Sequence, residues 1–154
     1  MGTSPHVYVD ADACPVKTEV FKVAARHELQ TTLVAANWMR IPADLRIDLV
    51  VVDQGFDAAD DWIAERAQAG DIVVTADIPL ASRCIAKGAA AIGTTGRPFT
   101  EDNIGDAVAT RNLLADLRGA GEQTKGPAAF TARDRSQFLQ ALESAVQASL
   151  RARR

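Results

Sequence analysis

The sequence predicts a three-layer α/β/α domain with a mainly parallel sheet of four or five strands, followed by two C-terminal helices. The first observation behind this prediction is that short β-branched runs alternate with segments of helical periodicity. The second is that these runs are apolar throughout, as is typical of strands buried on both faces of a parallel sheet. Because parallel neighbours need crossover connections, we expect helices on both faces and right-handed connections between the strands.

The first half of the chain contains three predicted strands. HVYVD, residues 6–10, is the first, and Pro15 suits the first turn of the helix that follows it. TTLVAA, residues 31–36, is the second strand. An irregular stretch with Pro42 inside it then leads to LVVVD, residues 49–53, which is the third strand.

The next segment repeats the alternation of helix and strand. A helix is expected over residues 57–69, and Gly70 is a suitable stop for it. DIVVTAD, residues 71–77, is the fourth strand, and a short helix follows and ends at Gly88. AAAIG, residues 89–93, is a short fifth strand.

The last third of the chain is predicted to be helical, without further strands. A helix is expected over 101–118, a Gly-rich connection over 119–131, and a final helix over about 132–151. The final helix carries apolar residues four apart, which predicts one buried face. Since all the strands suit one sheet, we expect residues 1–154 to form a single domain.

Composition narrows the classes of function. No apolar run approaches the ~20 residues that cross a bilayer, and the N-terminus lacks the features of a signal peptide. The two cysteines, Cys14 and Cys84, are in no metal-type spacing, so we expect a reducing cytoplasm and no membrane. The net charge of −3 argues against coating nucleic acid through bulk charge, but not against holding it locally through a metal. The sequence predicts no oligomeric state.

Polar side chains follow the predicted strands at the point where each strand ends. Because the carboxyl ends of parallel strands meet at one edge, we expect these side chains to be neighbours, at the edge where open α/β sheets bind ligands. The residues concerned are Asp10, Asp12, Asn37, Asp53 and Asp77, joined by Asp57, Asp60 and Asp61 at the start of the following helix.

Clustered carboxylates repel one another, which raises their pKa values and costs stability. A divalent cation compensates for this repulsion, and a site of aspartate oxygens without His or Cys suits Mg²⁺ or Mn²⁺. Such a site indicates metal-assisted phosphoryl chemistry, in which the ion activates water. The structural alternative is helix capping, because Asp12, Asp57 and Asp77 each precede a predicted helix by a residue or two.

Several motifs resemble those of the YaiI/YqxD family of bacterial proteins. They are VYVDADACPVKTEV, the strand end LVAAN, the run QGFDAADDWIAERAQAGDIVVTADIPLA and the late TKGP…TARDRSQF. The resemblance extends from about His6 to Leu142. The family has no established activity to transfer. It is grouped with the PIN-like superfamily of metal-dependent nucleases acting mostly on RNA, which implies a PIN-like fold and RNA as a partner.

The PIN-like resemblance places three acids. PIN domains have an aspartate at the end of the first strand, as Asp10 is, and another on a helix, as Asp60 is. A following strand ends T-x-D, which matches Thr75 and Asp77, and Thr75 would support the carboxylate by hydrogen bonding. PIN enzymes usually carry one more acid, for which this chain offers Asp44 and Asp48 in an irregular stretch, or Asp12, Asp53 and Asp57 as substitutes.

The first hypothesis is therefore a Mg²⁺- or Mn²⁺-dependent nuclease or phosphodiesterase. The expected catalytic residues are Asp10, Asp12, Asp60 and Asp77. The expected metal ligands are Asp10, Asp57, Asp60 and Asp77. The expected substrate contacts are Lys17, Asn37, Thr75 and Lys125.

Two other functions stay open. The Asp10-x-Asp12 pair also fits a phosphatase of the haloacid-dehalogenase kind, although Lys87 with Asp102 and Asp106 supplies its later motifs poorly. The third option is a non-catalytic domain that binds RNA or protein.

Two further side chains have alternative roles. Cys14 is either a nucleophile near a helix N-terminus or a small buried residue, and the second is favoured because no His lies nearby in the motif. Trp38 either stacks on a base or closes the core under a loop.

Overall fold

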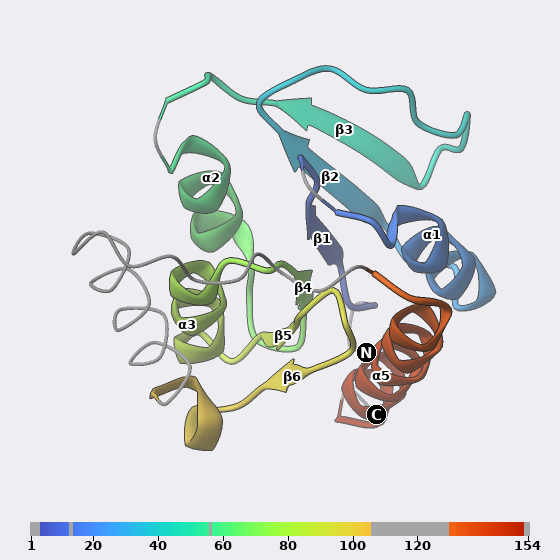
Figure 1. Cartoon of the computed structure of the whole chain (residues 1–154), viewed down its shortest axis with the longest axis vertical. Coiled ribbons are helices and arrows are strands. Elements are labelled where there is room, and N and C mark those ends of the chain that lie inside the picture. The colour runs from blue at the N-terminus through green and yellow to red at the C-terminus, as the bar shows by residue number, and fades with distance from the viewer. Residues whose placement is uncertain (1–3, 13, 56, 106–129, 153–154) are drawn as a thin grey trace.

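A six-stranded sheet forms the middle layer of the computed structural model, which describes residues 4–12, 14–55, 57–105 and 130–152 (Figure 1). The strand order is β3-β2-β1-β4-β5-β6, and all neighbours are parallel except β5 and β6. The strands are β1 (Val7–Asp10), β2 (Thr31–Ala35), β3 (Ile47–Val51), β4 (Ile72–Val74), β5 (Ala90–Ile92) and β6 (Pro98–Phe99).

Helices cover both faces of this sheet, which confirms the three-layer α/β/α fold (Figure 1). Helices α1 and α5 pack on one face, against Val9, Leu33 and Val74 of the strands. Helices α2 and α3 pack on the other, against Tyr8 and Val73. The helices are α1 (Lys17–Arg26), α2 (Ala58–Arg66), α3 (Ile78–Ala86) and α5 (Ala132–Ala152).

The final helix, α5, begins at a reciprocal cap. The Thr131 N–H donates to the Asp134 carboxylate at 2.9 Å, and the Asp134 N–H donates to the Thr131 hydroxyl at 3.1 Å. The predicted apolar stripe is confirmed, because Phe138, Leu142 and Val146 are buried against α1 and the sheet.

The prediction that no strand follows residue 93 is wrong, because Pro98–Phe99 forms β6, antiparallel to β5. Two paired residues that begin with a proline give no period-2 pattern, so the sequence carried no strand signal there. The turn into β6 contains Gly96 at φ +88°. A Cβ at this position would lie 2.6 Å from the backbone C and O of Gln137, so only glycine fits between the turn and α5.

Two further boundaries differ from the expectation or lie outside what is described. The third strand spans Ile47–Val51 instead of 49–53, because Ile47 pairs with Thr31 at the start of β2. Of the helix expected over 101–118, residues 101–105 are helical, and the remainder lies outside the described residues together with most of the 119–131 connection. The domain boundary, residues 1–154, stays a prediction.

Among the helices that the structure describes, none has the length and apolar character of a membrane-spanning segment.

The packing of α5 generates a stability prediction. Phe138 has no exposed surface, so Phe138→Ala should leave a cavity under α5 and lower the free energy of unfolding by about 3–5 kcal/mol. Gln140→Ala, on the exposed side of the same helix, is the matched control and should change it by less than about 0.5 kcal/mol. Urea unfolding followed by circular dichroism measures both, and equal values for the two variants would contradict the described packing of α5.

Candidate functional site

The site lies where the strand order of the sheet reverses. From β1 the chain builds the sheet outward through β2 to β3, and then returns to the other side of β1 with β4. In open α/β sheets, ligands bind in the crevice outside the carboxyl ends of the strands at this switch point. Asp10 ends β1 there, and Thr75 and Asp77 follow the adjacent β4.

Thr75 links the carboxyl ends of the two central strands. Its hydroxyl donates to Asp10 Oδ2 at 2.9 Å, and its Oγ1 accepts the N–H of Asp77, also at 2.9 Å. Thr75 is buried, so both hydrogen bonds are shielded from competing water. The threonine thus fixes one oxygen of Asp10 and the backbone that carries Asp77.

Asp77 is a helix cap and a member of the acidic cluster at the same time. Its Oδ1 accepts the N–H of Leu80 at 2.9 Å, and it is the N-cap residue of α3. Burial is the main cause of the raised pKa values of Asp10 and Asp60, and the charge of Asp77 adds to both of these shifts.

Asp60 comes from the first turn of α2, at the same edge of the sheet. Burial raises its pKa to about 7, and repulsion from Asp77 and Asp10, a hydrogen bond with Asp77 and the charge of Asp57 act in the same direction. Burial also raises the pKa of Asp10, opposed by its bond from Thr75 and supported by the charges of Asp77 and Asp12. The charges that contribute to these shifts belong to carboxylates of β1, α2 and the start of α3, which therefore lie near one another at this edge of the sheet.

Asp57 precedes α2 in a conformation that L-residues seldom adopt. Its φ is +66°, and its exposed side chain makes no capping hydrogen bond although it occupies the N-cap position. Strained backbone of this kind clusters at functional sites. The carboxylate of Asp57 is therefore not engaged as a cap of α2.

Asp12 and Asn37 are turned toward the outer strands. Asp12 is not the N-cap of α1, a position held by Val16; instead, its Oδ2 accepts the N–H of Ala36 at 2.8 Å. Asn37 Oδ1 accepts the amide of Gln54 at 2.8 Å. These two bonds connect the chain segments that follow β1, β2 and β3.

The remaining expected contacts fall in different places. Lys17 Nζ donates to the carbonyl of Cys14 at 2.9 Å, and Lys125 lies outside the described residues. Cys14 is buried and its pKa is raised by that burial, which favours the structural role over a reactive thiolate. Trp38 is 75% exposed, so its interpretation as a residue that closes the core is wrong.

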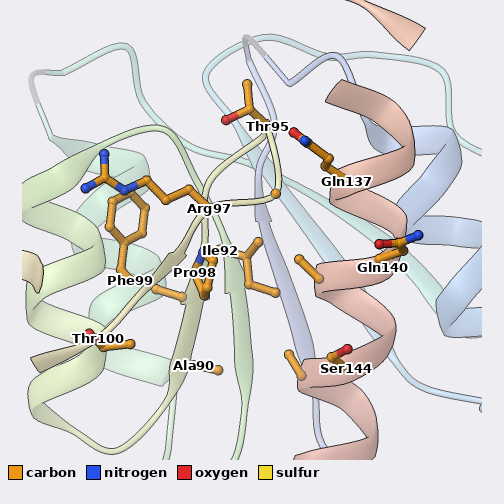
Figure 2. A pocket seen from close by; sticks show the side chains of 14 residues that line it. Ala90, Ile92, Thr95, Arg97, Pro98, Phe99, Thr100, Gln137, Gln140 and Ser144 are labelled. Carbon is orange, nitrogen blue, oxygen red and sulfur yellow. The ribbon is translucent and has the colours of Figure 1, made fainter. Parts of the chain in front are cut away.

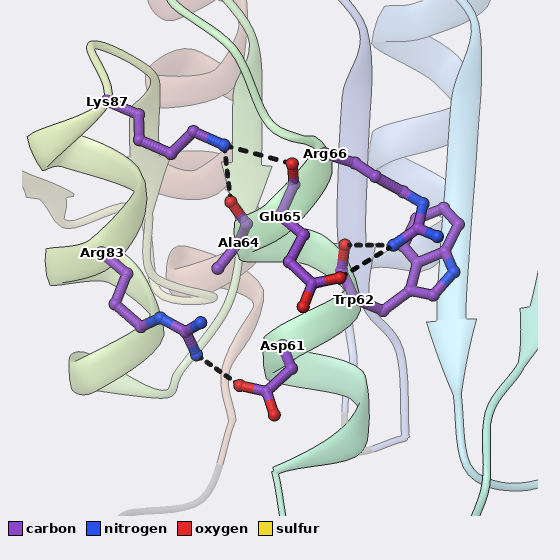
Figure 3. A network of polar contacts seen from close by, with 7 residues as sticks. All are labelled: Asp61, Trp62, Ala64, Glu65, Arg66, Arg83 and Lys87. Atoms are coloured by element: carbon purple, nitrogen blue, oxygen red, sulfur yellow. Dashed lines mark hydrogen bonds and ion pairs between the residues drawn. The ribbon is translucent and has the colours of Figure 1, made fainter.

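Cationic side chains of α3 hold α2, and with it Asp60, in place (Figure 3). Arg83 Nη1 donates to Asp61 Oδ1 at 2.7 Å, on the residue next to Asp60. At the far end of the helices, Lys87 Nζ donates to the carbonyls of Ala64 and Glu65, the last turn of α2. Sequence reasoning missed Arg83, because a pair between two helices leaves no spacing signal in either one.

A groove of about 840 Å³ lies elsewhere, between the β5–β6 hairpin and α5 (Figure 2). Its floor is apolar, with Ala90, Ile92 and Pro98 facing α5, and its rim carries Gln137 and Gln140. No carboxylate lines this groove, so it is separate from the acidic residues at the switch point.

In the described part of the chain, no three His, Cys, Asp or Glu side chains are already arranged as a metal-binding set. The carboxylates of Asp10, Asp60 and Asp77 are close enough to repel, yet not gathered around one point. Taken together, the fold and the site define an open α/β protein with a group of acidic residues at the carboxyl edge of its sheet, at the switch point.

The chain belongs to the YaiI/YqxD family, whose model, described as "Uncharacterized BCR, YaiI/YqxD family", matches residues 8–148. A UPF0178 protein of Rhodopseudomonas palustris (strain ATCC BAA-98 / CGA009) is 60% identical over 147 residues, covering 96% of this chain and 93% of its own. UPF0178 proteins of Caulobacter sp. (strain K31) and Bradyrhizobium diazoefficiens are 59% and 56% identical, over 91% and 94% of this chain and 93% and 86% of theirs. No solved structure matches the chain significantly.

The pKa of Asp60 generates a prediction on the pH dependence of stability without added metal. Because the pKa of Asp60 is higher in the folded than in the unfolded state, its protonation contributes to the free energy of unfolding. This contribution is fully present below about pH 4 and is lost as the pH rises through about 7. Asp60→Asn has no carboxyl group to ionise, so it should remove this fall in stability with rising pH. Since Asp60 is half-buried and partly screened by solvent, we expect a gain of about 1–2 kcal/mol at pH 8 and little change at pH 4. Urea unfolding at both pH values, in EDTA, measures this difference; parallel pH profiles would contradict it.

Thr75 generates a second prediction about the site. Thr75→Val keeps the shape of the side chain but leaves the N–H of Asp77 and one oxygen of Asp10 without their partner. The free energy of unfolding should fall by about 1–3 kcal/mol. Thr75→Ser retains the hydroxyl and should recover most of this loss. If valine and serine behave alike in urea unfolding, the hydroxyl bridge is not what holds the two strand ends.

Proposed function

We propose that this protein is a Mg²⁺- or Mn²⁺-dependent nuclease or phosphodiesterase that acts on RNA in the cytoplasm. The observation that supports the proposal is that Asp10, Asp60 and Asp77 come from separate elements to the same edge of the sheet, at its switch point, where the hydroxyl of Thr75 links the ends of β1 and β4. RNA as the substrate follows from the resemblance to PIN-like nucleases.

The donor set fits a hard divalent cation. It offers carboxylate oxygens without a thiolate or imidazole among them, and Mg²⁺ and Mn²⁺ bind through a few such oxygens together with waters and substrate phosphates. Because like charges repel in the metal-free site, we expect the carboxylates to draw together when a cation neutralises them. A bound cation would stabilise charge on the phosphodiester and lower the pKa of a water nucleophile.

The side chains around the cation have distinct tasks in this proposal. Asp10, Asp60 and Asp77 hold it, and Asp57, which is exposed and free of a capping bond, completes the set from the side of α2. Thr75 keeps Asp10 oriented through its hydroxyl.

The proposed substrate contacts are Lys17, Asn37, Thr75 and Lys125. Asp12 braces the segment after β2 through the N–H of Ala36, next to Asn37. Lys17, at the start of α1, and Lys125 would contact phosphates of the substrate.

The phosphatase alternative is less well supported by the geometry. A haloacid-dehalogenase site needs a lysine beside the aspartate pair. Lys87 instead lies at the end of α3 opposite Asp77 and binds the last carbonyls of α2 (Figure 3). Asp12 is engaged with Ala36, which does not favour its use as a general acid.

A metal titration tests the proposal. At a Mn²⁺ concentration about 100-fold above Kd, the folded state should gain about 2.7 kcal/mol, seen as a higher Tm. Asp10→Asn and Asp77→Asn should abolish this gain. Asparagine preserves the cap of α3, so a loss in Asp77→Asn reports the missing charge rather than a missing cap. Glu65→Gln, at an exposed position on α2, is the control and should respond as the natural sequence does.

Activity is then measured on a labelled single-stranded RNA with Mn²⁺ and with EDTA. Cleavage should require the metal and be lost in Asp10→Asn and Asp77→Asn. An unchanged Tm in millimolar Mn²⁺ would refute a metal site and favour the non-catalytic binding domain. A metal-dependent Tm without cleavage of RNA would refute the assignment of the substrate.

A further inference from the structure

The two edge strands of the sheet, β6 and β3, differ in whether their outward backbone groups are already hydrogen-bonded. At one edge, the outward groups of β6 are already used. Pro98 has no N–H, its carbonyl accepts the Asn103 amide at 3.0 Å, and the Thr100 N–H donates to Asn103 Oδ1 at 2.8 Å. Proline and side-chain capping of this kind prevent a further strand from adding to an edge.

The other edge, β3, is open. The carbonyl of Arg46 and the N–H of Val52 bind β2, so the alternate residues Leu49 and Val51 direct their N–H and C=O groups away from the sheet. Those groups have no partner within the described parts of the chain. The connection before β3 binds it only up to Ile47, whose N–H donates to the carbonyl of Asp44.

Apolar side chains are exposed along this same edge. Val51 is 49% exposed on β3, and Leu45, just before the strand, is 98% exposed. An edge strand with apolar side chains and a single acid, Asp48, lacks the charges that usually keep such edges apart. The edge is therefore suited to pairing with another strand.

The charges at the two ends of β3 indicate which strand would pair with it. Arg46 precedes β3 and Asp53 follows it, and both side chains are exposed. Within the described ranges, the guanidinium of Arg46 makes a single long ion pair, 3.7 Å from the exposed Glu28. If a second β3 runs antiparallel to the first, each Arg46 comes within one residue of the other copy's Asp53. The opposite charges of Arg46 and Asp53 at the two ends thus favour a second copy that runs antiparallel over one that runs parallel.

We propose that two copies of this chain pair through β3, antiparallel about a two-fold axis centred on Leu49, and form one continuous sheet. In this register Ile47 lies opposite Val51 and Asp48 opposite Val50, so all five residues of β3 are paired. A register centred on Asp48 would place two carboxylates face to face and is disfavoured. Because the paired strands run in opposite directions, the two groups of acidic residues lie at opposite ends of the joint sheet, and the pairing is independent of the proposed activity.

The oligomeric state in solution tests this inference. Sedimentation equilibrium of the full chain at micromolar concentration should give twice the 16.4 kDa of one copy. Val51→Lys should raise the dimer dissociation constant at least tenfold, because it places a charge in the paired edge. Ala148→Lys adds the same charge at an exposed position of α5 and should leave the constant unchanged. Circular dichroism confirms that each variant is folded.

Exchanging the charges at the two ends of β3 distinguishes a dimer that forms through β3 from one that forms through another surface. Arg46→Glu and Asp53→Arg should each weaken the dimer several-fold at low salt, and the double variant should recover most of the loss because the ion pairs reform in reverse. A monomer at all concentrations up to about 100 µM overturns the inference. So does a dimer that is insensitive to Val51→Lys, or single-charge variants whose effects simply add.

Discussion

Repulsion among carboxylates at the switch point is the constraint on which the rest of the site depends. Burial, together with the charges of Asp77 and Asp10, raises the pKa of Asp60 to about 7. Near neutral pH, a proton on Asp60 therefore relieves part of the repulsion in the absence of a cation. A divalent ion would compete with that proton, so occupancy of the site and its protonation are linked.

The surrounding contacts work against this repulsion. Thr75 joins the ends of β1 and β4, and the N–H of Leu80 neutralises part of the charge on Asp77. Arg83 holds the start of α2 against α3 through Asp61 (Figure 3). Each contact costs conformational freedom to keep like charges near one another, which is the arrangement expected of a binding site rather than of a fold optimised for stability.

The sequence predicted the layers and the edge that carries the acids, because both follow from periodicity and from the common direction of parallel strands. The T-x-D pattern, through its resemblance to PIN-like domains, also implied that Thr75 supports a carboxylate by hydrogen bonding, and its hydroxyl does donate to Asp10. It did not predict where Asp12 points, since the bond to Ala36 depends on how the chain turns after β1. The left-handed backbone conformation of Asp57 could not be predicted either, because an aspartate before a helix usually indicates an ordinary N-cap.

Asp77 shows why capping and ligation could not be separated from the sequence. One of its oxygens caps α3, while its charge acts on Asp10 and Asp60. A carboxylate has two oxygens with several lone pairs, so a single residue can serve both purposes. The strand–helix junction favours this double use because the helix begins at the edge where ligands bind.

The contact between Gly96 and Gln137 has a consequence for how this fold tolerates change. A bare α-carbon is all that separates the β5–β6 turn from the backbone of α5. Any larger residue would displace the β5–β6 hairpin from α5 and widen the groove between them (Figure 2). One missing methyl group therefore sets the spacing between the sheet margin and the C-terminal helix.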